Sequence, residues 1–359
     1  MEQAETGAPR RSRLAVDLTI LGLIGILLLG AVAAGGAALY QQFYSPSAFV
    51  TRYLDLLATG RAADALRVPG VALDRATLED AGIEPTASEA LLRQSALAPL
   101  TDVEVLSEKA ADGNVSVTVG YTAGRHEGMS TFTVSQDGWI GVAPSWRFSR
   151  SPLAAVKLTV RGSDRFVVNG FEIDRRQVSV AGQDAAPLDA LSLLVFTPGL
   201  YSVTVDTPIA TSPGVSVLAD TSLATTPVEV QAAPTKEFVR VVQERVEEFL
   251  EDCARQQVLQ PTACPFGLEV SNRIATLPRW SVAKHPKISV EPDGGYWRIP
   301  PADAVAHIEV DIKSLFDGSV QRVSEDVPFQ VNGTITILPD GSASIRVGSP
   351  ADAPPEGTQ

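Results

Sequence analysis

Three side chains capable of metal binding or acid/base chemistry alternate along one predicted strand. They are His307, Glu309 and Asp311, within an apolar pattern covering residues 304–312. A strand repeats every two residues, so all three lie on one sheet face, roughly 6.5–7 Å apart. An imidazole and two carboxylates could bind a divalent cation or share a proton transfer. That spacing is too wide for one metal ion without further ligands, so we interpret the cluster as the solvated face of a half-buried strand.

The chain has two cysteines, Cys253 and Cys264, separated by ten residues. Two cysteines without a nearby histidine are too few for a zinc site, and the C-x-x-C spacing of redox proteins is absent. The alternatives are a disulfide bond, formed in an oxidising compartment, and two buried free thiols. We predict the disulfide, which would contribute on the order of 3 kcal/mol by closing this short loop.

Four arginines flank a predicted hairpin turn at Asn169-Gly170 and could form an anion site. Guanidinium groups bind phosphate and carboxylate in a bidentate manner, so these side chains could hold an anionic wall polymer or a phosphate head group. The chain lacks the G-x-S-x-G, S-x-x-K, H-E-x-x-H, Walker and G-x-G-x-x-G patterns of common hydrolases and nucleotide-binding enzymes. We therefore name no catalytic, cofactor-binding or metal-binding residue; the candidate anion patch is Arg161, Arg165, Arg175 and Arg176.

Composition limits the class of protein. The 359 residues suffice for two or three domains, and 45% apolar with 20% charged residues excludes a largely disordered chain. A net charge of −13 disfavours a protein-wide attraction to nucleic acid, so no nucleic-acid partner is expected. The mean hydropathy of +0.10 is slightly high for a soluble protein and indicates a segment adapted to another solvent.

That segment is residues 18–39, which contain no charged side chain. As a helix it would span about 33 Å, enough for a bilayer core of roughly 30 Å, so we predict a transmembrane helix over residues 18–40 in contact with lipid. Arg10, Arg11 and Arg13 precede it, which by the positive-inside rule makes residues 1–17 cytoplasmic and the C-terminal domains extracytoplasmic. The alternative is a cleaved signal peptide with an Ala-x-Ala site at residues 31–33.

Small residues on one side of this helix allow a close helix pair. Gly30, Ala34 and Ala38 form a small-xxx-small pattern that would support a homodimer in the membrane. The simpler alternative is that small residues merely fill an alanine-rich segment.

Two regions follow the membrane segment. Residues 45–152 should form an α+β domain, beginning with a helix capped by Ser45 and Pro46 and ending in an antiparallel meander. Its strands are expected around residues 103–105, 115–119, 131–134 and 146–148, with turns at Asp112-Gly113, Gly124-Arg125 and Asp137-Gly138. Residues 153–233 predict a small antiparallel β-sandwich followed by a linker, with strands near 158–160, 166–168, 171–173, 177–180 and 201–205.

A second α+β domain is predicted over residues 235–348. Thr235 should cap a long amphipathic helix, after which a meander follows the disulfide. Residues 349–359 are rich in proline, alanine and glycine and are expected to be disordered. The meander strands are expected near residues 280–282, 287–290, 296–299, 304–312, 329–338 and 344–347, with turns at Asp293-Gly294, Asp317-Gly318, Asn332-Gly333 and Asp340-Gly341.

Two segments resemble known families. Residues 46–150, with a helix before a curved meander, look like the NTF2-like fold. Residues 155–206, with Val168-Asn169-Gly170 and the later run Pro198-Gly199-Leu200-Tyr201-Ser202-Val203, are similar to the PEGA-type β-module, although the middle is longer. The order of elements resembles uncharacterised actinobacterial single-pass envelope proteins and, distantly, the teicoplanin-resistance-associated membrane proteins. A high alanine content and an excess of arginine over lysine fit a high-GC bacterium.

These features predict a non-catalytic binding, scaffold or accessory protein of the bacterial envelope, anchored in the cell membrane. Its partners would be an envelope protein or a wall polymer. The alternative is an NTF2-like domain with a small-molecule catalytic pocket, for which a deep cavity with a buried carboxylate or histidine would be required.

Overall fold

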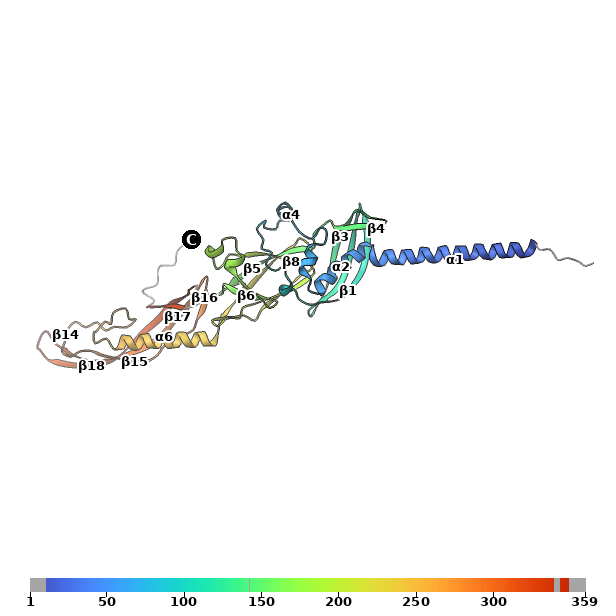
Figure 1. Cartoon of the computed structure of the whole chain (residues 1–359). Helices are drawn as coiled ribbons and strands as arrows, with labels where there is room; N and C mark the ends of the chain where they lie inside the picture. Colours follow the sequence, from blue (N-terminus) through green and yellow to red (C-terminus); the bar gives the residue numbers. More distant parts are fainter. Residues whose placement is uncertain (1–10, 142, 339–342, 349–359) are drawn as a thin grey trace, which may run out of the picture.

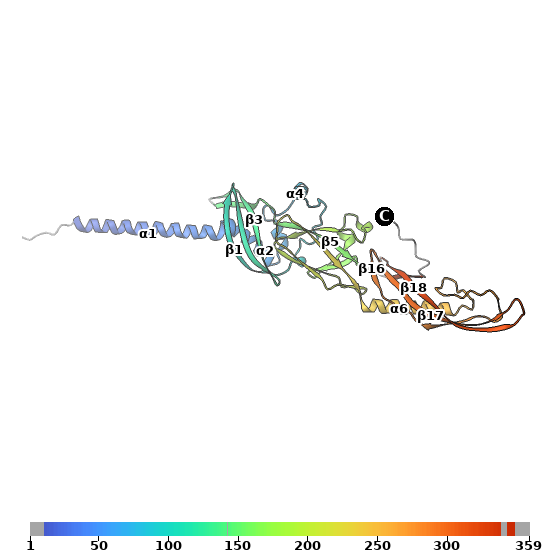
Figure 2. The same ribbon diagram turned by 180° about the vertical axis from the view of Figure 1, so that it is seen from behind.

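The computed structural model describes residues 11–141, 143–338 and 343–348. The fold is mixed α and β, with most of its regular structure in the strands of several sheets. The molecule is elongated, with the helix α1 projecting from one end and the hairpin of β17 and β18 forming the other (Figures 1 and 2). The predictions for residues 1–10 and 349–359 lie outside the described residues, as does the turn expected at Asp340-Gly341.

The helix α1 covers Arg11–Phe43 and includes the apolar segment found in the sequence. Its side chains are described at residues 18–32, 35–36 and 40–43, and the large apolar ones there are exposed, from 43% at Tyr40 to 72% at Leu29. In the part of the chain that is described, no helix was found with the length and apolar character needed to cross a lipid bilayer. The side chains of Ala34 and Ala38 lie outside this description, so the helix pairing stays a prediction.

A four-stranded antiparallel sheet of order β1-β2-β3-β4 follows α1. The predicted cap of the helix that follows α1 is confirmed, because the Ser45 hydroxyl accepts a hydrogen bond from the backbone N–H of Ala48 at 3.1 Å. The apolar stripe of that helix packs on the inner side of the sheet, against Phe132 and Phe148. The elements are α2 (Pro46–Ala58), α3 (Ala62–Leu66), α4 (Arg75–Asp80), the 3₁₀ turn η1 (Gln94–Ala96), β1 (Leu100–Ala111), β2 (Asn114–Ala123), β3 (His126–Ile140) and β4 (Ala143–Phe148).

The central region consists of two sheets, of order β11-β9-β6-β7 and β12-β5-β8. The hairpin turn predicted at Asn169-Gly170 is confirmed, with φ of 50° and 90° at the two residues. A two-stranded pair, β10 and β13, lies beside them. The elements are β5 (Leu153–Arg161), β6 (Arg165–Val168), β7 (Phe171–Asp174), α5 (Arg175–Val178), η2 (Gly182–Asp184), β8 (Leu191–Phe196), β9 (Gly199–Thr204), β10 (Ala210–Thr211), β11 (Val215–Ala219), β12 (Thr225–Gln231) and β13 (Ala233–Pro234).

The strand β5 belongs to two hydrophobic cores. Leu153 and Ala155 pack with the core of the first α+β region, whereas Val156 and Leu158 pack with the core of the β11-β9-β6-β7 sheet and the distal domain. A strand buried on both faces reads as a continuous apolar run, which is the sequence of residues 153–156 at the start of β5. Both cores therefore extend across the predicted boundary near residue 153, although the boundary itself stays a prediction.

The distal domain is a long helix packed on a six-stranded sheet. Thr235 caps the helix as predicted, accepting a hydrogen bond from the Phe238 N–H at 3.1 Å. The predicted apolar face is also confirmed, because Phe238, Val242 and Val246 are buried. The elements are α6 (Lys236–Ala254), β14 (Arg273–Ile274), β15 (Arg279–Lys284), β16 (Glu291–Asp293), β17 (Tyr296–Lys313), β18 (Val320–Ile337) and β19 (Ala343–Gly348).

The central sandwich differs from the prediction in three ways. It is not wholly antiparallel, because β12 pairs with β5 in parallel, a geometry that the long intervening connection allows. The expected linker is instead largely the strands β12 and β13. Residues 177–180 do not form a strand: α5 occupies residues 175–178, since the Asp174 carboxylate caps it by accepting from the Arg176 N–H at 2.9 Å.

Three further local predictions were wrong. Residues 287–290 form no strand, because the Ile288 N–H donates to the Gln243 side chain at 2.8 Å rather than to a neighbouring strand. Asp137-Gly138 is an irregularity within β3, whose pairing to β4 shifts between Gln136 and Trp139. Asn332-Gly333 lies inside β18, where Gly333 is required because a Cβ atom would lie 2.4 Å from the Arg346 carbonyl oxygen.

Candidate functional site

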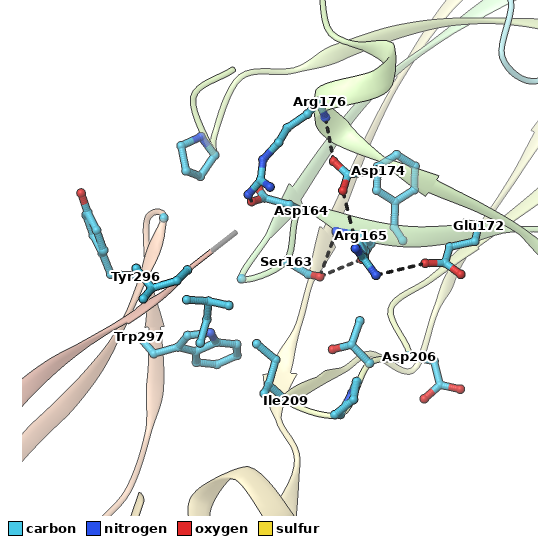
Figure 3. Close-up of a pocket in the computed structure, with 18 of the residues that line it drawn as sticks. Ser163, Asp164, Arg165, Glu172, Asp174, Arg176, Asp206, Ile209, Tyr296 and Trp297 are labelled. Atoms are coloured by element: carbon cyan, nitrogen blue, oxygen red, sulfur yellow. Dashed lines mark hydrogen bonds and ion pairs between the residues drawn. The ribbon is translucent and has the colours of Figure 1, made fainter. Parts of the chain in front are cut away.

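A cavity of about 530 Å³ opens between the central sheets and the distal domain. One wall comes from the hairpin of β6 and β7 and from the segment before β6; the other comes from the start of β17 and the end of β18. Figure 3 shows Tyr296 and Trp297 on the distal strands, across the cavity from the charged side chains of the central region. Asp206 and Ile209, from the connection after β9, complete its floor. We refer to this cavity as the cleft.

Local sequence positions the charged wall of the cleft. The Asn169-Gly170 turn closes the β6–β7 hairpin, so Arg165 and Asp174 are opposite each other in register. The Asn169 side chain also donates to the carbonyl oxygens of Ala96, at 2.8 Å, and Leu200, at 2.7 Å, which fixes the hairpin against the first α+β region. The charged wall is therefore carried by a hairpin that is held at its turn.

The charges in the cleft do not balance. Its lining contains four carboxylates and two guanidinium groups, leaving two net negative charges. Arg176 is paired with Asp164 at 2.7 Å, whereas the Asp206 carboxylate has no hydrogen-bond or ion-pair partner among the described residues. The other pairs are longer, because Arg165 lies 3.6 Å from an Asp174 oxygen and 3.8 Å from a Glu172 oxygen. The cleft thus has the electrostatic character of a cation site.

The distal wall supplies aromatic and apolar surface. Tyr296 is 56% exposed at the rim, whereas Trp297 is buried with its ring packed edge-on against Phe238 at 5.6 Å. The two walls meet at Gly295, where a Cβ atom would lie 2.3 Å from Cγ of Pro187 in the central region. Glycine therefore permits the close approach that closes this end of the cleft.

In the described structure, each of the four arginines of the predicted anion patch has a carboxylate or carbonyl partner. Arg165 and Arg176 lie in the cleft with the carboxylate partners given above, and Arg161 is outside its lining, 3.7 Å from Glu229. Arg175 is fully buried and donates to the carbonyl oxygens of Asp189, Val160 and Ala186 at 2.7, 2.8 and 3.2 Å. Burial lowers the pKa of Arg175, and Asp164 opposes that effect. Arg175 is a structural residue.

The cluster His307, Glu309 and Asp311 lies on one face of β17. The residues that alternate with them along the strand are buried on the opposite face. His307 Nδ1 is 2.7 Å from an Asp326 oxygen, and Glu309 pairs with Arg279 at 3.1 Å. In the described parts of the chain, no group of three or more His, Cys, Asp or Glu side chains is arranged to hold a metal ion. The side chains of His307 and Glu309 form cross-strand pairs on the surface of the sheet, and the Asp311 N–H donates to the Thr276 hydroxyl at 2.9 Å.

The predicted disulfide is confirmed. Cys253 in the last turn of α6 is bonded to Cys264, with 5.8 Å between their Cα atoms. The bond ties the buried end of α6 to the following loop, where Phe266 packs against Trp280 at 5.0 Å between ring centroids. The disulfide is part of the distal core and lies outside the cleft lining.

The inner side of the first sheet, where the alternative function requires a catalytic pocket, is filled by side chains. The rings of Phe132 and Phe148 lie 6.2 and 5.1 Å from that of Tyr53. The Tyr53 hydroxyl lies within hydrogen-bond distance of the carbonyl oxygens of Thr197 and Pro152, at 3.0 and 3.2 Å. Burial raises the pKa of Tyr53 well above its ordinary value, as expected for a core residue.

Sequence reasoning did not identify the residues that define the cleft. Asp206 and Ile209 lie in a stretch with no regular pattern, and Tyr296 was noted only as part of a strand. The available signal was the Asp293-Gly294 turn, which is confirmed and precedes Tyr296. Nothing in the spacing of residues 206 and 296 indicates that the fold brings them to one cavity.

Comparison with known proteins gives no relative on which a function could be based. No family model matches the chain, and neither the curated proteins nor the solved structures include a significant match.

Proposed function

We propose that this chain is a membrane-anchored, extracytoplasmic binding protein of a bacterial envelope. The anchor is supported by the sequence of residues 18–39, which carry no charge, and by the exposed apolar side chains of α1. Arg10, Arg11 and Arg13 favour a cytoplasmic N-terminus. Residues 1–13 contain three arginines and two glutamates and so have a net charge of +1. Because the whole chain has a net charge of −13, the remaining residues have a net charge of −14.

Membrane fractionation tests the anchor. The full chain should stay in the membrane pellet after an alkaline carbonate wash, whereas Leu27→Arg combined with Leu28→Arg should release it, since each charge in the apolar segment costs about 3 kcal/mol. Recovery of the wild-type chain in the soluble fraction would contradict the anchor. A mature N-terminus at Ala34 would identify a cleaved signal peptide instead.

Within the ectodomain, we assign binding to the cleft and propose a ligand that carries a cationic group, such as a lysine-bearing peptide of an envelope partner. The observation that carries this assignment is the net negative lining, with Asp206 unpartnered in the described structure. The exposed ring of Tyr296 offers a face for a cation, an interaction of about 0.5–1 kcal/mol at exposed sites. Among the described residues that line the cleft, no nucleophile is paired with a base, so we propose binding without catalysis.

Titration calorimetry with trilysine and with inorganic phosphate tests this assignment. Trilysine should bind the full chain in detergent, and Asp206→Asn should weaken binding about 2- to 5-fold, as expected for one exposed charge pair. Glu229→Gln is the matched control, because Glu229 is exposed but lies outside the cleft. Equal affinities for the two variants, or binding of phosphate in preference to trilysine, would contradict a cation site.

For the individual domains, we propose that residues 45–152 belong to the NTF2-like fold and that residues 153–233 are a PEGA-type module. The first proposal is supported by helices packed on a curved antiparallel meander. The second is supported by the Val168-Asn169-Gly170 turn and by β9, which begins at Gly199.

A further inference from the structure

The end of the β3–β4 hairpin presents an apolar surface that the fold does not cover. Trp139 and Ile140 are 66% and 74% exposed, and they pair with Pro144 and Ala143. The sequence has no charged residue between Asp137 and Arg147. Neither this tryptophan nor this isoleucine belongs to the core of the domain, so the uncharged hairpin end leaves both exposed.

This hairpin is fixed to the end of α1. The indole N–H of Trp146 in β4 donates to the carbonyl oxygen of Tyr44, directly after α1, at 2.8 Å. Trp139 pairs with Pro144, which lies two residues before Trp146 in β4. Trp139 is therefore only about 7 Å closer to the end of the hairpin than the hydrogen-bonded Trp146. In both views the hairpin end reaches toward the side from which α1 extends (Figures 1 and 2).

Exposed aromatic residues also lie at the end of α1 and directly after it. Tyr40, Phe43 and Tyr44 are 43%, 50% and 48% exposed at the end of the apolar segment. Aromatic rings are enriched at the level of lipid head groups, where one edge contacts the acyl chains and the other contacts water. The hairpin therefore stands beside the part of α1 that would cross the membrane–water interface.

We propose that the β3–β4 hairpin is a second membrane contact, which inserts Trp139 and Ile140 into the bilayer interface beside α1. This inference rests on the proposed membrane anchor. The occupant is lipid because the hairpin end has no charged residue and is held by the Trp146 hydrogen bond beside the end of the apolar helix α1. Two contacts rather than one fix the ectodomain in a defined orientation, so the distal cleft is held away from the membrane.

Site-specific fluorescence on the full chain, reconstituted in vesicles of phosphatidylethanolamine and phosphatidylglycerol, tests the proposal. Both native cysteines are in the disulfide, so a single introduced cysteine can carry a nitrobenzoxadiazole label. The test position is Ile140→Cys. The matched control is Phe316→Cys, fully exposed at the opposite end of the molecule, and Leu27→Cys reports on α1. Quenching by nitroxide lipids is compared with quenching by aqueous iodide.

A label at position 140 should lose about half of its emission with nitroxide lipids and be shielded from iodide, whereas a label at position 316 should show the reverse. If position 140 behaves like position 316 while position 27 is quenched by the lipid, the hairpin contact is wrong and the anchor stands. Shielding of position 140 from both quenchers would indicate a protein contact and also overturn the proposal. Failure of the lipid to quench position 27 would overturn the anchor, and the hairpin contact with it.

Discussion

Replacing Arg175 by alanine should strongly destabilise the central sheets. The side chain is fully buried, and its guanidinium group donates to the backbone of Val160 at the end of β5 and to the backbone of Ala186 and Asp189 in the loop before β8. That loop also supplies Pro187 to the cleft. Arg175 therefore replaces the regular strand pairing that this loop lacks.

The magnitude follows from the contacts that are lost. The buried carbonyl oxygen of Val160 loses a charged donor, and leaving it unsatisfied costs about 1 kcal/mol or more, whereas the partly buried carbonyl oxygens of Ala186 and Asp189 lose theirs at a smaller cost. The aliphatic part of the side chain leaves a cavity, which adds about 1 kcal/mol. Removal of the charge also removes its desolvation cost, which offsets part of the loss. We therefore expect Arg175→Ala to lower the unfolding free energy by about 3–5 kcal/mol, the range for breaking a buried polar network. Arg175→Met keeps much of the volume and should cost about 2–3 kcal/mol.

Equilibrium unfolding in urea, followed by tryptophan fluorescence, measures these differences. The control is Arg176→Ala, since Arg176 is partly exposed and its side chain has one close carboxylate partner, so that change should cost under about 1 kcal/mol. If Arg175→Ala unfolds within about 1 kcal/mol of wild type, or costs no more than Arg176→Ala, the structural role argued for Arg175 is wrong.

Burial raises the pKa of Tyr53 and Tyr201 above the ordinary value of 10.0, so the unfolded chain loses these protons first. Ionisation of these two tyrosines should therefore leave the unfolding free energy unchanged below pH 10 and lower it as the pH rises above 10. A combined Tyr53→Phe and Tyr201→Phe variant should show a flatter decline of the unfolding free energy in urea titrations at alkaline pH. Replacing Cys253 and Cys264 by serine should lower the unfolding free energy by about 2–4 kcal/mol, and an unchanged urea midpoint would contradict this. Gly295→Ala should push Pro187 away and weaken trilysine binding in the calorimetric assay; unaltered affinity would show that this contact does not shape the cleft.

Local features of the fold could be predicted because their causes lie within a few residues. Ser45 and Thr235 cap helices since a hydroxyl oxygen reaches an N–H three residues later. Asn169-Gly170 forms a hairpin turn because both residues adopt a positive φ. The disulfide needed only the argument that two cysteines close in sequence pair in an oxidising compartment.

The features that were missed depend on distant parts of the chain. Residues 177–180 have an alternating pattern, but the Asp174 cap and the burial of Arg175 favour a helical turn there. The parallel pairing of β12 with β5 depends on a return over a long connection, which local periodicity does not reveal.

The cleft is a juxtaposition of the same long-range kind. Asp206 and Tyr296 come from segments with no common pattern, and only the packing of the two domains places them around one cavity. The carboxylate and carbonyl partners of the four arginines could not be seen in the sequence, because they come mostly from neighbouring strands and loops.

The most direct test of a membrane-anchored extracytoplasmic binding protein is labelling of single cysteines in intact cells with a membrane-impermeant maleimide. Phe316→Cys, at the fully exposed distal hairpin, should be labelled without permeabilisation, whereas Ser12→Cys, before the apolar segment, should react only after the membrane is opened. Labelling of position 12 in intact cells, or protection of position 316, would contradict the topology on which the proposed function rests.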